Sequence, residues 1–175
     1  LFGGYVLFLV TLPPGLLWDA EGNGYDVLEY HLQAQREYFD TGHITFLPHN
    51  VYASFPQQME ILYLWLMWGR GGPCSAAIAA QMLHLSFGVL SVLTVVAWSP
   101  RGWGRVVAAL TAGSVPWLAY VGCLAYVELG LLYLTALTAA LLVEQLRLDA
   151  ASGASIGDDP APVKPTVRRA DWRVT

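Results

Sequence analysis

The chain has 175 residues and a formal net charge of −4, with 55% hydrophobic and only 13% charged residues. Soluble domains carry about 25% charged residues, so the composition favours a membrane protein. The sequence shows no basic patch, and we therefore expect no nucleic-acid partner. It begins at Leu1 without an initiator methionine, and we expect it to be part of a longer protein.

Long apolar segments predict the fold class. A transmembrane helix needs about 20 mostly apolar residues, and four segments reach or approach this length: 1–18, 75–99, 106–123 and 127–146. Pro116 and Gly122 predict a kink or a shortening in the third segment. We therefore predict an all-α, polytopic membrane protein with about four spans, in which segment 1–18 is truncated or bent by Pro13 and Pro14.

Segment 55–69 has two interpretations. It is short for a membrane span and carries Glu60, which is unfavourable in hydrocarbon. Its Tyr63, Trp65 and Trp68 are typical of a helix that lies at the level of the lipid headgroups. We favour the interfacial helix, and a short fifth span is the alternative.

The basic residues predict the orientation. Arg101 and Arg105 follow the second span, and further lysines and arginines follow the fourth. With four spans both groups share one side, which the positive-inside rule makes cytoplasmic. Loop 19–74 then faces outwards. Segment 147–175 is rich in Ala, Ser, Gly, Asp and Pro after its first residues, and it is expected to be a disordered cytoplasmic tail.

The first part of the outer loop predicts an amphipathic helix over residues 25–41. Polar residues recur at three- and four-residue steps and share one face: Asp26, Glu29, Gln33, Arg36, Glu37 and Asp40. Leu28, Leu32 and Phe39 lie roughly opposite, and Gly42 is expected to end the helix. The apolar face would rest on the membrane surface. The polar face is either a solvated surface of acid–arginine pairs or part of a functional site.

The next part of the loop, residues 43–56, mixes histidines, amides, hydroxyls and aromatic rings. This mixture suits contacts with sugar or phosphate. For His31 and His43 we favour structural hydrogen bonds, and we expect His84 in the second span to bond a neighbouring helix. Glu128 stands at the outer end of the fourth span, where an acid indicates a function, with a structural ion pair as the alternative.

A family resemblance rests on residues in the loop and on their order downstream. The first loop string is Tyr25-Asp26-Val-Leu-Glu29-Tyr30-His31-Leu32. The second, within 42–63, consists of Gly42, Ile44, Leu47-Pro48, Asn50-Val-Tyr52, Phe55-Pro56, Glu60 and Leu62-Tyr63. Downstream follow Leu83-His84, Pro116-Trp117 and Ala125-Tyr126-Val-Glu128-Leu129. Together they resemble bacterial membrane proteins of the GT-C glycosyltransferase superfamily, near the protein O-mannosyltransferase and aminoarabinose transferase group. The resemblance covers roughly residues 1–146.

The resemblance implies a function and roles for individual residues. It implies transfer of a sugar from a polyprenyl-phosphate donor to an acceptor hydroxyl, at the outer face of a bacterial inner membrane. Asp26 would be the general base, and Glu128 would orient the acceptor or help to hold a divalent metal ion such as Mg²⁺ or Mn²⁺. The remaining residues expected to bind substrate are Glu29, Tyr30, His31, Arg36, His49, Asn50, Tyr52 and Glu60.

Departures from the family pattern keep a second hypothesis open. Gln33 stands where relatives often have proline, and Glu128 stands where aspartate is commoner. The chain also carries about half of the spans of such enzymes, so a missing C-terminal half or a partner subunit would complete it. The alternative is a non-catalytic membrane protein: a truncated paralogue, a subunit of a complex or a transport component.

Overall fold

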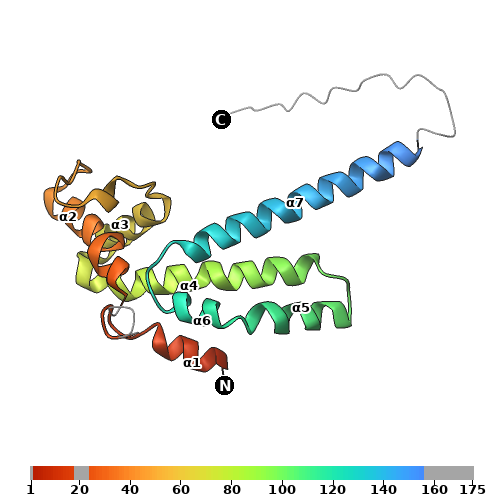
Figure 1. Ribbon diagram of the computed structural model, residues 1–175, viewed down its shortest axis with the longest axis horizontal. Helices are drawn as coiled ribbons and strands as arrows, with labels where there is room; N and C mark the ends of the chain where they lie inside the picture. Colours follow the sequence, from red (N-terminus) through yellow and green to blue (C-terminus); the bar gives the residue numbers. More distant parts are fainter. Residues whose placement is uncertain (1, 18–23, 156–175) are drawn as a thin grey trace, which may run out of the picture. The chain divides into compact units, whose positions relative to one another are not determined.

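The computed structural model describes residues 2–17 and 24–155, and its regular elements in these ranges are all helical (Figure 1). In chain order they are α1 (Phe2–Leu9), η2 (Val27–His31), α2 (Gln33–Thr41), η3 (Val51–Ser54), α3 (Gln58–Arg70), α4 (Pro73–Trp98), α5 (Trp103–Gly113), α6 (Pro116–Gly122) and α7 (Glu128–Ser155). The all-α prediction is confirmed. The chain divides into two compact units, residues 1–140 and 141–175, which are described separately.

Two helices in the described part of the chain are long and apolar enough to cross a membrane, namely α4 and residues 128–150 of α7. They correspond to the predicted spans 75–99 and 127–146. Both are candidate spans by length and composition. A helix rises about 1.5 Å per residue, so about 20 residues cross a hydrocarbon core about 30 Å thick.

The other two predicted spans do not form single helices of that length. Helix α1 ends at Leu9, shortly before Pro13 and Pro14. Segment 106–123 is divided into α5 and α6, because Pro116 has no N–H to continue the first helix and instead begins the second. The predicted kink at Pro116 is therefore confirmed, whereas an unbroken span over 106–123 is not.

Most of segment 55–69, which had two interpretations, forms helix α3. Its 13 residues rise only about 20 Å, too little for a straight span. Glu60, Tyr63 and Met67 are buried on one side, while Trp65 and Trp68 are exposed on the other. A position at a membrane interface stays a prediction.

The predicted helix over 25–41 consists of two pieces. The N–H of Leu32 bonds the carbonyl of Val27 in a wide π-turn, η2, and α2 follows. This turn alters the spacing of side chains, so Val27 and His31 are buried whereas Leu28, expected on the apolar face, is exposed. Gly42 ends α2 in the left-handed conformation, as predicted. None of the residues expected on the polar face is buried: Asp26, Glu29, Gln33, Arg36, Glu37 and Asp40.

In the second unit the described residues of the expected tail are helical. Helix α7 continues through residues 147–155, where the composition predicted disorder. Local pairs along the helix favour this extension: Glu144 with Arg147 at 3.9 Å, and Gln145 donating to Asp149 at 2.9 Å. The prediction of a disordered tail over 156–175 lies outside the described residues.

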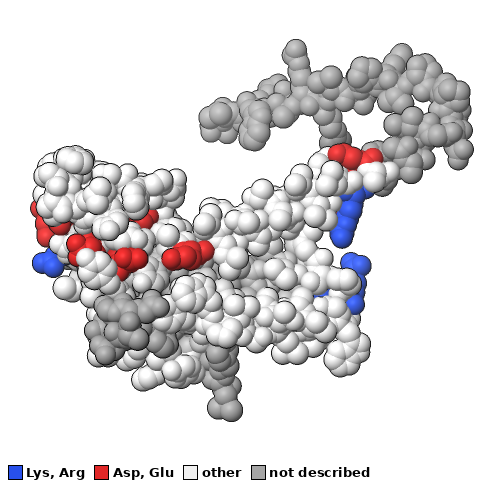
Figure 2. Space-filling view, viewed as in Figure 1, with Lys and Arg blue, Asp and Glu red and all other residues white. Residues whose placement is uncertain are grey.

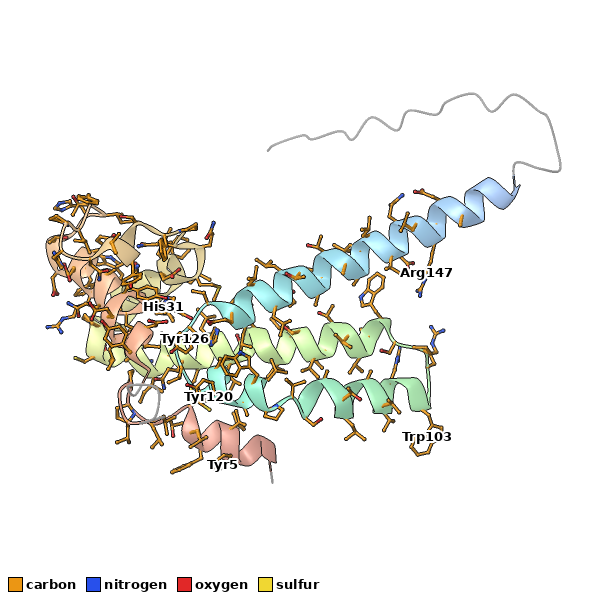
Figure 3. All side chains as sticks on the ribbon, in the orientation of Figure 1. Tyr5, His31, Trp103, Tyr120, Tyr126 and Arg147 are labelled. Atoms are coloured by element: carbon orange, nitrogen blue, oxygen red, sulfur yellow. The ribbon has the colours of Figure 1, made fainter. Side chains whose placement is uncertain are left out.

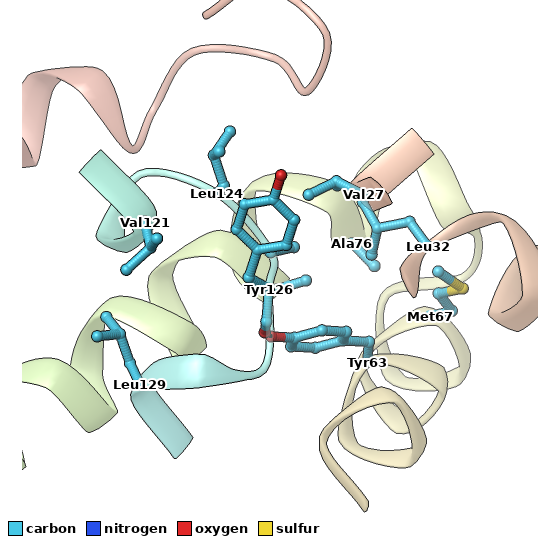
Figure 4. Close-up of a cluster of buried hydrophobic side chains, with 11 residues drawn as sticks. Val27, Leu32, Tyr63, Met67, Ala76, Val121, Leu124, Tyr126 and Leu129 are labelled. Atoms are coloured by element: carbon cyan, nitrogen blue, oxygen red, sulfur yellow. Dashed lines mark hydrogen bonds between the residues drawn. The ribbon is translucent and has the colours of Figure 1, made fainter. Parts of the chain in front are cut away.

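The core of the first unit surrounds the connector between α6 and α7. Residues 124–126 of this connector are buried together with residues of η2, α3 and α4 (Figure 4). The Tyr63 hydroxyl donates a hydrogen bond to the backbone carbonyl of Tyr126. Helix α4 also packs against α3, α5 and α6. The connector thus holds the start of α7, and with it Glu128, next to the polar lobe, which we define as residues 24–72.

Buried polar residues of α4 complete the hydrogen bonds of broken helices. Gln81 Nε2 donates to the carbonyls of Val10 and Leu12 at 2.8 and 2.9 Å. Pro14 cannot donate to the Val10 carbonyl four residues earlier, so Gln81 takes the place of the missing N–H. His84 Nε2 accepts the N–H of Leu129, in the first turn of α7, at 3.0 Å. This bond confirms the prediction that His84 joins a neighbouring helix.

Candidate functional site

The two acids predicted as catalytic lie near one phenol. Asp26 precedes η2 and Glu128 begins α7, and both side chains are exposed. Burial raises the pKa of Tyr30 to about 12, with further contributions from the negative charges of Asp26 and then Glu128. Carboxylates far apart in the chain therefore act on the same hydroxyl, which stays protonated at neutral pH.

A third acidic residue of the candidate site, Glu60, is buried. Glu60 is 5% exposed and His31 is 3% exposed, and His31 Nδ1 lies 2.9 Å from Glu60 Oε1. The other oxygen, Oε2, has no hydrogen-bond partner among the described residues. Burial raises the pKa of Tyr63 well above its usual value, and the charges of Glu60 and Glu128 raise it further. Glu60 therefore belongs to the same electrostatic cluster as Asp26 and Glu128.

His31 also contacts the connector. Its ring lies edge-on to that of Tyr126, with centroids 5.5 Å apart (Figure 3). Tyr126 therefore contacts the site through its ring, while its backbone carbonyl accepts from Tyr63. Neither Tyr63 nor Tyr126 was predicted as a site residue, although both occur in the strings that carry the family resemblance. Their position in those strings was the available signal.

Tyr30 is part of a group of rings held by a buried amide. Tyr30 and Tyr52 are stacked with centroids 5.2 Å apart at 26°, and Phe55 meets Tyr52 edge-on at 5.7 Å. Asn50 Nδ2 donates to the Glu29 carbonyl at 2.8 Å, and its Oδ1 accepts from the N–H of Ala53. Asn50 thus caps η3 and ties it to η2. Glu29 contributes through its backbone in this contact.

The remaining predicted substrate-binding residues form pairs along α2. Arg36 lies 3.8 Å from Asp40, and both side chains are exposed. His49 Nε2 lies 3.1 Å from Glu37. Arg36 and His49 thus belong to the acid–cation pairs that were one interpretation of this face. Figure 2 shows acidic side chains on the polar lobe and near the start of α7, and basic ones at the edge of the polar lobe, at the link between α4 and α5 and on α7.

A divalent metal ion has limited support from the described residues. They contain no group of three His, Cys, Asp or Glu side chains that could hold one. Mg²⁺ is commonly held by one or two carboxylates together with substrate phosphates and water, and Asp26 with Glu128 meets that smaller requirement. These two acids would hold the ion, which would supply positive charge to the site.

Apolar cavities lie beside the start of α7. One of about 330 Å³ is lined by residues of α1, α4, α5, α6 and α7, among them Val6, Leu85 and Val89. A second of about 320 Å³ is lined by Trp117, Leu132 and other residues of α6 and α7, and it includes Glu128. Glu128 therefore stands where the acidic surface meets apolar space.

No protein family matches the chain, and no curated protein or solved structure matches it either.

Proposed function

We propose that the protein is a GT-C-like membrane glycosyltransferase, or the N-terminal portion of one. It transfers a sugar from a polyprenyl-phosphate donor to an acceptor hydroxyl at the outer face of a bacterial inner membrane. The observation that carries the proposal is the pair of exposed carboxylates, Asp26 before η2 and Glu128 at the start of α7, the second of which lines an apolar cavity. An inverting transfer needs this combination of a carboxylate base and a site for a lipid.

The chemistry assigns one task to each group. Asp26 removes the proton of the acceptor hydroxyl, whose oxygen then forms the bond to the anomeric carbon. The bond from that carbon to the phosphate oxygen breaks, and polyprenyl phosphate leaves with the bonding electrons. Glu128 accepts a hydrogen bond from the acceptor, and the protonated Tyr30 hydroxyl is available as a donor.

The proposal places the polar lobe outside the membrane. Helices α4 and α7 cross as two spans, α1 is the inner part of a bent span, and α5 with α6 forms a kinked one. Helix α3 then lies at headgroup level with Trp65 and Trp68 towards the lipid. The apolar cavities accommodate part of the donor hydrocarbon chain.

The decisive test is Asp26→Asn in the full-length protein. We expect at least about 100-fold less sugar transfer from a polyprenyl-phosphate donor, with folded protein at the wild-type level, because the amide cannot accept the proton. Asp40→Asn is the matched control, since Asp40 is an exposed acid of the same lobe paired with Arg36. Transfer by the Asp26 variant at the control rate would remove Asp26 from the base role.

Topology is tested by cysteine labelling. Thr45→Cys is made together with Cys74→Ser, because Cys74 is an exposed free thiol and Cys123 is buried. A membrane-impermeant thiol reagent should label position 45 in intact cells stripped of the outer membrane. Labelling that requires opening of the inner membrane would place the polar lobe on the cytoplasmic side.

One observation favours the non-catalytic alternative. Arg36 pairs with Asp40, and Arg70 Nε donates to the Ser75 carbonyl at 3.2 Å. In this arrangement neither arginine stabilises the negative charge of the leaving phosphate. The charge would have to come from a metal ion, another segment or a partner. A full-length protein that transfers no sugar from any of a panel of polyprenyl-phosphate donors, yet purifies with a catalytic partner, would favour a subunit role.

A further inference from the structure

Three aromatic rings form a continuous surface on the polar lobe. We call Tyr30, Tyr52 and Phe55 the aromatic platform; Tyr30 is stacked on Tyr52, and Phe55 meets Tyr52 edge-on. Tyr52 is 43% exposed and Phe55 is 56% exposed. Exposed rings in mutual contact present more apolar area than scattered single residues do, and such patches mark binding surfaces.

The platform is preorganised. Asn50 is buried, and its side chain bonds the backbone of η2 through the Glu29 carbonyl and the backbone of η3 through the Ala53 N–H. Because these two elements carry Tyr30 and Tyr52, the two rings are held together without a ligand. A rigid surface loses little conformational entropy on binding.

The chemistry around the platform selects its occupant. The exposed carboxylates of Asp26 and Glu128 lie close enough to Tyr30 for their negative charges to raise its pKa. Such a surface repels phosphate and anionic lipid headgroups and offers many hydrogen-bond acceptors. A sugar ring without phosphate fits both conditions, because its C–H face lies against aromatic rings and its hydroxyls donate to carboxylates.

We propose that the aromatic platform binds the apolar face of an unphosphorylated sugar ring, whose hydroxyls donate to Asp26 and Glu128. This inference rests on the proposed function and specifies it: the acceptor is a saccharide, and the phosphate of the donor lies elsewhere. Tyr52 and Phe55 are therefore determinants of acceptor specificity, and Asn50 is a positioning residue.

The test is binding of sugars to the full-length protein in nanodiscs of phosphatidylcholine. A panel of neutral oligosaccharides and their phosphorylated counterparts is screened by saturation-transfer NMR, and dissociation constants of the ligands found are then measured. We expect neutral sugars to bind better than phosphorylated ones. Tyr52→Leu should weaken binding about 10-fold or more, because it keeps apolar volume but removes the flat ring, whereas Tyr52→Phe should stay within about 3-fold.

Phe46→Leu is the matched control, since Phe46 is 72% exposed in the same loop and lies outside the platform. Equal loss in the control and in Tyr52→Leu would overturn the inference, as would the absence of neutral-sugar binding or a preference for phosphorylated sugars.

The two proposals fail separately. If the protein transfers sugar and Tyr52→Leu leaves the KM for the acceptor unchanged, the proposed role of the aromatic platform is wrong and the proposed glycosyltransferase activity stands. If the full-length protein binds sugar through Tyr52 but transfers none, the aromatic platform is a saccharide-binding site and the proposed catalytic function is wrong.

Discussion

The polar lobe and helix α4 both bury polar side chains, but they do so for different partners. In the lobe, His31 and Glu60 pair with each other. In α4, Gln81 and His84 bind backbone groups that a broken helix or a helix start leaves without partners. The α4 residues follow from the need to give buried backbone groups hydrogen-bond partners. The His31–Glu60 pair satisfies no backbone group, and we therefore associate it with the acidic side chains of the candidate site.

The largest expected effect comes from separating that pair. His31→Leu leaves the buried Glu60 side chain without its hydrogen-bond partner, and we expect a loss of about 3 kcal/mol in the free energy of unfolding. Denaturant unfolding in detergent would measure it. The double variant His31→Leu, Glu60→Leu should recover most of the loss, because the buried polar group that lacked a partner is then also removed. A double variant as unstable as the single one would contradict the buried pair.

A smaller effect is expected in α4. Gln81→Leu removes the donor to the carbonyls of Val10 and Leu12, and it should lower stability by about 1–2 kcal/mol, as found for hydrogen bonds between membrane helices. Met82→Leu is the control, because Met82 is the exposed neighbour of Gln81. Equal stability of the two variants in the same unfolding assay would show that α1 does not depend on this contact.

The smallest effect is a change in the pKa of Tyr30. Asp26→Asn should lower this pKa from about 12, because a negative charge beside the phenolate is removed, and Glu128→Gln should lower it less. A ¹³C-tyrosine NMR titration, with Tyr30→Phe for assignment, measures the shift. A pKa insensitive to both changes would refute the convergence of the two acids.

The raised pKa also sets the sign of a pH effect. Tyr30 holds its proton more tightly in the folded chain than in the unfolded one. Its contribution to stability is therefore fully present below its ordinary pKa of 10.0 and is lost as the pH rises through about 12. The loss should be absent from Tyr30→Phe in alkaline unfolding experiments.

Local features of the sequence were sufficient for part of the fold. The lengths of the apolar runs predicted α4 and α7, Gly42 predicted the end of α2, and Pro116 predicted the break between α5 and α6. Each depends on neighbouring residues alone, through hydropathy, left-handed backbone or a missing N–H. The wide turn of η2 lacked such a signal, and the periodicity over 25–41 therefore misplaced Leu28.

For the site, the sequence by itself showed that acidic, aromatic and amide side chains are concentrated in the first loop. The family resemblance then indicated Asp26, together with Glu128 further along the chain, as the catalytic acids. Tertiary structure decided which residues meet: Glu60 with His31, Tyr30 with Tyr52, and residues 124–126 of the connector with the lobe. These contacts join segments far apart in the chain, and no helical or turn periodicity encodes them. They form because burying the connector and pairing the enclosed charge lower the free energy only in the assembled fold.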